Sequence, residues 1–334
     1  MSDTPDVSVV MSVYNDAAYL REAVESILRQ EGVSRELIVI NDGSTDGSGD
    51  LLDEYARKDP SVRVLHQDNQ GLTRSLIVGC SMARGRYIAR QDSDDISLPG
   101  RLRRLANELD QNERLTIVSS LSALMGPGGE FLLIEPDKSA PVDPRNDTYC
   151  HGSLMFRRDA YELIGGYRAE FRAAQDVDLQ FRLTEAGGIG LVPELLYAHR
   201  ILDQSISSRS PIQKRLSRLA EAAREVRYSG NDESQLLAEA SRISSEVGGK
   251  RSEPGTGSYF IGRCLYARRD RRALPYLWAA CANSPFSIRS WIALALAVVL
   301  TRSNQGQNVT QISGLTTIHA GKNGGKPVRD TLCG

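Results

Sequence analysis

Hydrophobic residues in the first hundred positions alternate between two spacings. Residues 7–13 form a short β-rich run, and residues 20–28 then place Leu, Val and Ile at helical spacing. The alternation continues with strands at 37–40, 62–65 and 86–90 and with helices near 51–55 and 73–83. Strands that alternate with helices in this way predict an α/β domain with a mostly parallel sheet.

The pattern is less regular after residue 100. We expect helices over 99–112 and 175–186, strands over 115–124, 131–134 and 153–156, and a loop over 139–147. After residue 207 the spacing becomes helical, first on a face that carries Leu216 and Leu219 and again over 259–282. The chain therefore combines an α/β domain with a helical C-terminal region.

The last apolar segment is too short to cross a membrane as a helix. Residues 291–300 are wholly apolar, and a helix that starts at Ser287 would have 14 residues. At about 1.5 Å per residue it spans roughly 21 Å, whereas the hydrocarbon core is roughly 30 Å thick. We therefore predict a buried or interfacial helix.

The net charge changes sign along the chain. Residues 1–207 carry a net charge of −11, whereas residues 208–302 carry +8. We therefore divide the chain into a domain at 1–207, a basic helical region at 208–302 and a polar tail at 303–334, which we expect to be disordered. An acidic domain suits metal-assisted work on a phosphate ester, and a basic region suits an anionic surface.

Composition and motifs narrow the function classes. The five cysteines are widely spaced and the four histidines are scattered, so a zinc, dithiol or histidine-rich metal site is not expected. The first strand is not followed by a glycine-rich phosphate loop, which argues against an NAD-dependent oxidoreductase and a nucleotidyltransferase. Because we recognise no secretory signal, we expect a cytoplasmic location. We expect no nucleic-acid partner.

Three carboxylates follow the strand at 86–90 directly, and they are Asp92, Asp94 and Asp95. Carboxylates this close raise one another's pKa, and Mg²⁺ or Mn²⁺ binds carboxylate oxygens together with substrate phosphates. The same residues are also good turn and helix-cap residues, so this stretch alone leaves both interpretations open. Asn15 and Asp42 fall at other strand ends, where ligands of open parallel sheets bind.

Five sequence blocks follow one another in a set order, at residues 9–15 (VVMSVYN), 39–46 (VINDGSTD), 71–76 (GLTRSL), 83–95 (ARGRYIARQDSDD) and 174–179 (AQDVDL). Together they resemble glycosyltransferase family 2, of the type found in bacterial polysaccharide synthesis. The resemblance covers residues 7 to about 207. It implies the GT-A fold, in which helices flank a Rossmann-like, nucleotide-binding mixed sheet, and an inverting transfer of a sugar.

The resemblance also implies a donor site. Asp42 would accept hydrogen bonds from the nucleotide base, while Val13 and Tyr14 pack against that base beside Asn15. Residues 41–44 could instead form a plain turn before a helix. This block therefore predicts either a base-binding site or an ordinary connection.

Two arginines match family positions near the donor. Arg74 would contact the nucleotide or its phosphates, although it could also be an exposed helix cation, and Arg200 would lie near the diphosphate. The family commonly has Asn where this chain has Ile77, so one polar contact beneath the donor loop is expected to be missing.

The family's Asp-x-Asp motif corresponds to Asp92 and Asp94. The resemblance implies that Asp94 coordinates Mn²⁺ or Mg²⁺, that Asp92 reaches the ribose or the metal, and that Asp95 supports the metal site. The ion would neutralise the charge that grows on the leaving nucleoside diphosphate.

Asp176 is the expected catalytic base. Inversion requires a group that takes the proton of the acceptor hydroxyl, and a carboxylate within hydrogen-bond reach can do so. Asp176 and Asp178 could instead be acidic residues favoured by the helix dipole. Asp178 is expected to orient the start of the helix.

We therefore expect a metal-dependent inverting glycosyltransferase of the hexosyltransferase type. It would move a sugar from a nucleotide-diphosphate donor, with a UDP-sugar favoured, to a glycan or lipid-linked acceptor in polysaccharide or glycolipid synthesis. The alternative is a catalytically impaired relative that binds sugar nucleotides or acts as a scaffold. The presence of Asp94 and Asp176 argues against that alternative.

Residues 263–300 combine arginines with the apolar run at 291–300. They could rest the protein on the inner face of an anionic membrane, where a lipid-linked acceptor would be available. A solvated helical cap over the catalytic domain is the alternative.

Overall fold

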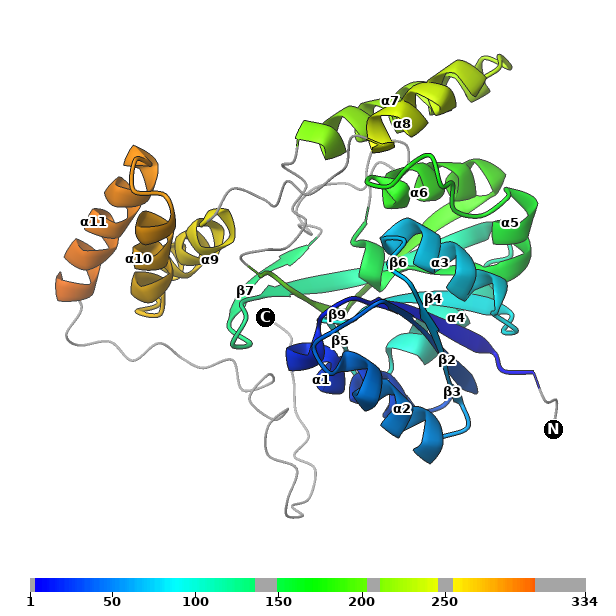
Figure 1. Ribbon diagram of the computed structural model, residues 1–334, viewed down its shortest axis with the longest axis horizontal. Coiled ribbons are helices and arrows are strands. Elements are labelled where there is room, and N and C mark those ends of the chain that lie inside the picture. The colour runs from blue at the N-terminus through cyan, green and yellow to red at the C-terminus, as the bar shows by residue number, and fades with distance from the viewer. Residues whose placement is uncertain (1–3, 136–148, 203–210, 246–254, 304–334) are drawn as a thin grey trace.

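A computed structural model describes residues 4–135, 149–202, 211–245 and 255–303 of the chain (Figure 1). The loop predicted at 139–147, and the tail predicted at 303–334 apart from its first residue, lie outside the described residues. The strands are β1 (Val7–Val13), β2 (Arg35–Asp42), β3 (Val62–Gln67), β4 (Tyr87–Asp92), β5 (Ile96–Ser97), β6 (Leu115–Met125), β7 (Phe131–Glu135), β8 (Met155–Arg157) and β9 (Gly188–Arg200). The helices are α1 (Ala17–Leu28), α2 (Ser48–Lys58), α3 (Leu72–Ser81), α4 (Arg101–Gln111), η1 (His151–Ser153), α5 (Arg158–Leu163), α6 (Gln175–Ala186), α7 (Pro211–Tyr228), α8 (Ser234–Ser245), α9 (Thr256–Ala267), α10 (Ala273–Asn283) and α11 (Ile288–Ser303).

The strands form a mixed sheet in the order β3-β2-β1-β4-β8-β6-β9-β5, and β7 pairs with β6. β3, β2, β1 and β4 are mutually parallel, as the alternating pattern predicts. β8 runs antiparallel to β4 and to β6, so the sheet as a whole is less parallel than the pattern predicts. The pattern does not predict β9 at all, because Pro193 and Glu194 interrupt its apolar sequence.

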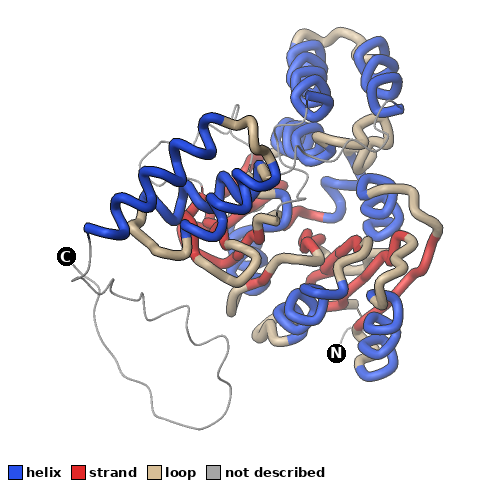
Figure 2. Tube along the Cα trace, turned by 60° about the vertical axis from the view of Figure 1, so that its left-hand side comes forward, coloured by secondary structure: helices blue, strands red, loops and turns tan. Residues whose placement is uncertain are grey.

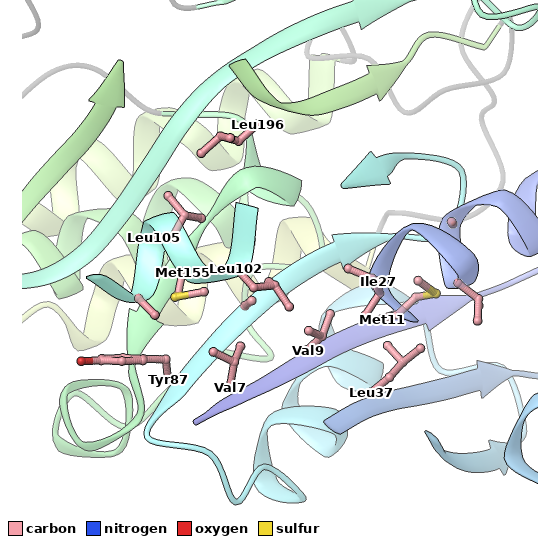
Figure 3. Close-up of a cluster of buried hydrophobic side chains, with 14 of the residues drawn as sticks. Val7, Val9, Met11, Ile27, Leu37, Tyr87, Leu102, Leu105, Met155 and Leu196 are labelled. Atoms are coloured by element: carbon pink, nitrogen blue, oxygen red, sulfur yellow. The ribbon is translucent and has the colours of Figure 1, made fainter. Parts of the chain in front are cut away.

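Helices cover both faces of this sheet. Alternate residues of a strand point to opposite faces, and in β1 Val9 and Met11 pack with α1, α2 and α4, whereas Val10 packs with α3, α5 and α6. Figure 3 shows Val9 and Met11 with Ile27 and other members of the first cluster. Ile77 joins the second cluster as a partly buried apolar residue. The two clusters hold the strands so that their carboxyl ends remain at one edge.

The C-terminal helices form two separate groups, which Figures 1 and 2 show on different parts of the sheet domain. α7 and α8 pack on α6 through an apolar cluster that includes Phe181 and Leu216. α9, α10 and α11 pack on β6 and β7 through a cluster that includes Leu132 and Leu277. The basic helical region therefore contacts the domain at two places.

The helical stretch predicted at 259–282 is two helices in the structure. α9 ends at Ala267 and α10 begins at Ala273, and between them Arg269 has a positive φ of 57°, a conformation outside the right-handed helix. The helix predicted at 287–300 is α11. Within the described residues, we find no helix with both the length and the apolar character needed to cross a membrane.

Candidate active site

The carboxyl ends of β2, β1 and β4 lie next to one another and carry most of the predicted site residues. In the sheet register, Val13 pairs with Asn41 and Ser12 pairs with Asp92. The residues that follow β1 therefore lie between Asp42 and the acidic turn at 92–95. This arrangement is the one expected when ligands bind at strand ends.

Asp94 is the least compensated acid at this edge. Its carboxylate is half-buried and accepts no hydrogen bond from any residue that the structure describes. Burial, followed by repulsion from Asp95, Asp92 and Asp16, raises the pKa of Asp94 to about 8. Such a carboxylate would be stabilised by a cation.

Asp16 belongs to the same acidic cluster, although the sequence analysis did not select it. Ser93 donates a hydrogen bond to Asp16 across the edge of the sheet. Burial raises the pKa of Asp16 despite that bond, and the charges of Asp92 and Asp46 add to the rise. Its position directly after Asn15, at the end of a strand beside β4, is the signal that could have identified it.

Asp92 is paired with a buried arginine. Arg90 is 1% exposed, and its guanidinium donates a hydrogen bond to the Asp92 carboxylate. Burial alone would raise the pKa of Asp92, but the Arg90 charge, with smaller contributions from His151 and His199, lowers it below its usual value. Asp92 is therefore ionised and partly neutralised, while Asp94 lacks such a partner among the described residues.

Asp95 is fully buried and holds β9 against the acidic turn. Its carboxylate accepts a hydrogen bond from the Tyr197 hydroxyl at 2.8 Å and another from the Arg200 backbone N–H at 2.8 Å. Burial raises its pKa to about 6. These contacts support a positioning role, and the predicted part of Asp95 in metal binding stays a prediction.

The Arg200 side chain braces the same turn from the other side. Its Nε donates to the Asp94 carbonyl oxygen at 2.8 Å, and its two terminal nitrogens donate to the Pro127 carbonyl at 2.9 Å and to Glu22 at 2.7 Å. The guanidinium also lies 4.7 Å from the centre of the Tyr19 ring. Every guanidinium nitrogen thus has a protein acceptor, and the predicted contact of Arg200 with a diphosphate stays a prediction.

Asp176 lies in the first turn of α6 and is half-buried. His151 lies between Asp176 and the acidic turn, because the negative charges of Asp176 and Asp92 both raise the pKa of its imidazole. Burial, with the nearby Arg90 charge, lowers the pKa of His151 to about 4 against the effect of the two carboxylates. The imidazole is therefore neutral at pH 7, and its Nε2 lies 2.7 Å from the Tyr167 hydroxyl.

The start of α6 is held by buried ion pairs and by packing. Asp178 is 1% exposed and accepts hydrogen bonds from Arg182 at 3.0 Å and from Arg168 at 3.4 Å. Ala174, which precedes the helix, has a φ of 59° and is 1% exposed. A positive φ in a residue with a Cβ persists where surrounding packing imposes it. These contacts agree with the orienting role expected for Asp178.

The end of β1 offers one aromatic face to a ligand. Tyr14 is 53% exposed, whereas Val13 is fully buried in the core beneath it. Asn15 has a φ of 58°, which Asn tolerates better than most residues, and its side-chain oxygen accepts the Thr45 N–H at 2.8 Å. Tyr14 is therefore the accessible member of this group, and Asn15 closes the turn.

Asp42 is buried and organises the loop that follows β3. Its carboxylate accepts hydrogen bonds from the Gln67 amide at 2.7 Å and from the backbone N–H groups of Gln70 and Gly71 at 2.8 Å each. Its side chain is 1% exposed. The predicted contact between Asp42 and a nucleotide base stays a prediction.

Arg74 lines an open pocket of about 270 Å³ together with Asn69, Gln70 and Arg172. Two guanidinium groups at one pocket suit an anionic ligand. The sequence analysis did not select Arg172, although it precedes the acidic start of α6 by only a few positions. A cation so close to the expected base is the signal that could have identified it.

The side chains of the acidic cluster do not by themselves supply a complete set of metal ligands. Within the described residues, no three His, Cys, Asp or Glu side chains are placed so that they could hold a metal ion together.

Comparison with known proteins agrees with this geometry. The model of the family described as Glycosyl transferase family 2 matches residues 8–165. The Bacillus subtilis protein named "Putative glycosyltransferase EpsE" is 35% identical over 217 residues, which cover 63% of this chain and 78% of EpsE. The hyaluronan synthase of Pasteurella multocida is 29% identical over 217 residues, which cover 63% of this chain but only 22% of that protein.

A solved structure supports the fold. The crystal structure of TarS from S. aureus superposes with a TM-score of 0.51 at 17% identity and covers 85% of this chain and 54% of the TarS chain. The mixed sheet flanked by helices is thus the predicted GT-A fold. On the family match and the identity to EpsE, this chain belongs to glycosyl transferase family 2, a family of glycosyltransferase enzymes.

Proposed function

We propose that the protein is a metal-dependent, inverting glycosyltransferase that uses a nucleotide-diphosphate sugar, with a UDP-sugar favoured. The observation that carries the proposal is the Asp94 carboxylate. Burial and three neighbouring carboxylates disfavour its ionised form, and a bound cation would stabilise that form. The expected base, Asp176, acts on the same histidine as Asp92 of the acidic turn. One region of the molecule could therefore hold a donor diphosphate and activate an acceptor.

The acidic cluster fits Mn²⁺ or Mg²⁺. Hard cations prefer carboxylate oxygens, and Asp94 offers both of its oxygens without a competing donor among the described residues. Asp92 would support the same ion or the ribose, and Asp95 would keep the turn in place. When bound, the ion would act as a Lewis acid that neutralises charge on the donor diphosphate. The donor phosphates would complete its coordination.

The remaining residues would bind and orient the two substrates. The exposed Tyr14 ring would stack on the nucleotide base, and the Asp42-organised loop would border that base. Arg74 would contact the nucleotide or its phosphates beside Arg172. Asp176 would accept the proton of the acceptor hydroxyl as that oxygen attacks the anomeric carbon. The bond from this carbon to the donor diphosphate would break at the same time, and the nucleoside diphosphate would leave.

The acceptor is proposed to be a growing glycan or a lipid-linked saccharide at the cytoplasmic face of a membrane. The hyaluronan synthase named above is similar to this chain over 63% of its length, which favours polysaccharide synthesis. The division of the chain into a catalytic domain at 1–207 and a basic helical region at 208–302 belongs to this proposal.

Replacement of Asp176 tests the assignment of the base. A thermal-shift screen of nucleoside diphosphates and sugar nucleotides with Mn²⁺ or Mg²⁺ would first identify the donor, because ligands that bind the folded state raise the melting temperature. We expect Asp176→Asn to keep that shift and to lower transfer to saccharide fragments about 100-fold or more. Asp94→Asn should instead reduce the metal-dependent part of the shift.

Asp159→Asn is the matched control, since Asp159 is an exposed acid in the first turn of another helix, α5. It should retain transfer. Undiminished transfer by Asp176→Asn would show that Asp176 is not the base. If the donor raises the melting temperature equally with and without metal, donor binding does not depend on the metal.

A further inference from the structure

An exposed apolar face covers the outer side of α10 and α11. On α11, Ile288, Trp291, Ile292 and Leu296 recur at helical spacing, and each is at least 44% exposed. Trp278 of α10 and Phe286 of the connecting turn, which is 97% exposed, extend the same face. We call these six residues the outer apolar face. Apolar side chains that are exposed together mark interaction sites more often than solvated surface.

The face is one continuous surface rather than a set of scattered side chains. The Trp278 and Trp291 rings meet edge to face with their centroids 6.2 Å apart, so α10 and α11 join there. The Trp291 indole N–H donates to the Pro285 carbonyl at 2.8 Å, which ties the turn that carries Phe286 to α11. The opposite side of α11 is already occupied, because Ala293 and Ala297 are buried against α9 and α10.

The charge around this face favours an anionic partner. Residues 255–303 contain seven arginines and a single acidic residue, Asp270, for a net charge of +6. Arg268 stacks on the Phe131 ring and Arg272 binds Asp270, so both contribute to packing within the protein. Arg289 is exposed and directly follows Ile288 of the outer apolar face. Tryptophan rings beside arginines are typical of surfaces that bind at the membrane–water interface.

The helices that carry the face are joined to the acidic turn by a short series of contacts. The Tyr276 hydroxyl of α10 donates to Glu130 at 2.9 Å, and Glu130 lies in the turn between β6 and β7. Pro127 of that turn accepts a hydrogen bond from Arg200, which also holds the Asp94 carbonyl oxygen. A partner bound to the face would therefore be held at a defined position relative to Asp94.

We propose that the outer apolar face inserts into the interfacial layer of an anionic lipid membrane. α11 has 16 residues and is about 24 Å long, shorter than a hydrocarbon core of roughly 30 Å, so the helix would lie in the interface. The apolar side chains would enter the acyl boundary, while the arginines remain with the lipid phosphates. This inference deepens the proposed function, since a lipid-linked acceptor would then be presented near the acidic turn.

Intrinsic fluorescence provides a direct test on the full chain. The protein contains two tryptophans, and both, Trp278 and Trp291, belong to the outer apolar face. Vesicles of equal parts phosphatidylglycerol and phosphatidylcholine should shift the emission to shorter wavelength and sediment the protein. Vesicles of phosphatidylcholine alone should bind it several-fold less, and added salt should weaken binding to the anionic vesicles.

Matched variants separate insertion from unspecific adhesion. The double variant Ile288→Ser/Ile292→Ser should bind anionic vesicles about tenfold or more weakly, because two apolar side chains no longer enter the lipid. Leu163→Ser is its control, since Leu163 of α5 is 80% exposed but lies in another helix. Arg289→Gln should weaken binding more than Arg218→Gln, which removes an exposed arginine of α7.

Two outcomes would overturn the proposal. If neither emission nor sedimentation responds to anionic vesicles, the face does not bind lipid. If the wild type is a dimer in light scattering and the double variant is a monomer, with no vesicle binding, the face contacts a second copy of the chain. The vesicle experiments use no sugar nucleotide, and the transfer assay uses soluble saccharide fragments without vesicles. A negative result in one experiment therefore does not affect the other.

Discussion

The two groups of C-terminal helices are both rich in arginine, but they differ in their acidic residues and in what one arginine of each group contacts. In α7 and α8, Arg227 binds Glu185 of α6 and Glu233, and Glu233 in turn binds Arg168. In α9 to α11, Arg289 is exposed beside the outer apolar face. The first group faces inward and supports the helix that carries Asp176, whereas the second presents a surface outward. The number of arginines alone does not distinguish these roles, whereas the acidic residues do, with five in residues 211–245 and one in residues 255–303.

Truncation of one buried leucine in each helix group should give the largest effect on stability and should distinguish the two groups by the activity that each variant loses. Leu216 of α7 and Leu277 of α10 are both fully buried, so Leu216→Ala and Leu277→Ala should each lower the free energy of unfolding by about 3 kcal/mol. Leu216 packs in the cluster of Ala174 and Phe181, whereas Leu277 packs with β6 and β7. Leu216→Ala should therefore lower transfer more, and Leu277→Ala should lower vesicle binding more.

Denaturant unfolding, a transfer assay and vesicle sedimentation check this pair. Equal losses of transfer and of vesicle binding in both variants would contradict the distinction between an inward and an outward group.

Removal of the Arg227 charge should have the next largest effect. Arg227 is 17% exposed and donates to Glu185 at 2.7 Å, so Arg227→Gln removes a charged partner from two partly buried carboxylates, Glu185 and Glu233. Only Glu185 loses its arginine partner altogether, because Glu233 keeps Arg168. We expect the free energy of unfolding to fall by about 2 kcal/mol. The exposed Arg218 of the same helix provides the control, and Arg218→Gln should change stability by less than about 0.5 kcal/mol. Chemical denaturation of the two variants measures the difference, and similar values for both would argue against the inward network.

Low pH should weaken the ion pairs of Glu233 with Arg168 and Arg227, and the expected change in stability is smaller than that for Arg227→Gln. Burial alone would raise the pKa of Glu233, but hydrogen bonds from Arg168 and Arg227 lower it below its usual value of 4.5. A lowered pKa in the folded state contributes stability above the unfolded value, and this contribution is lost as the pH falls through the folded pKa. The melting temperature of the wild type should exceed that of Glu233→Gln most at pH 7, and the gap should narrow below about pH 4.5. A gap that does not change with pH would show that the charge of Glu233 does not matter.

The first four strands and the order of the site motifs could be predicted from the sequence, because their signals are local. Apolar runs such as residues 7–13 bury a whole strand, and turn residues follow at each strand end. β9 could not be predicted, because Pro193 and Glu194 break its pattern and its pairing with β6 bridges residues far apart in the chain. Asp16 was missed for a related reason, since its acidic neighbours Asp92 and Asp46 belong to β4 and to the loop after β2.

The α/β alternation, the family motifs and the separation of an acidic segment from a basic one follow from the amino-acid sequence alone. The distant partners of the acids at the candidate site could be identified only in the folded protein, because the sheet brings together side chains that are far apart in the chain. Tyr197 of β9 donates to Asp95 and Asp16 lies near Asp94, whereas Arg90 and Asp92 are already close along the chain. The folded structure also shows which arginines are paired within the protein. An arginine forms an internal ion pair where packing brings an acidic side chain beside it, and otherwise it stays exposed to solvent.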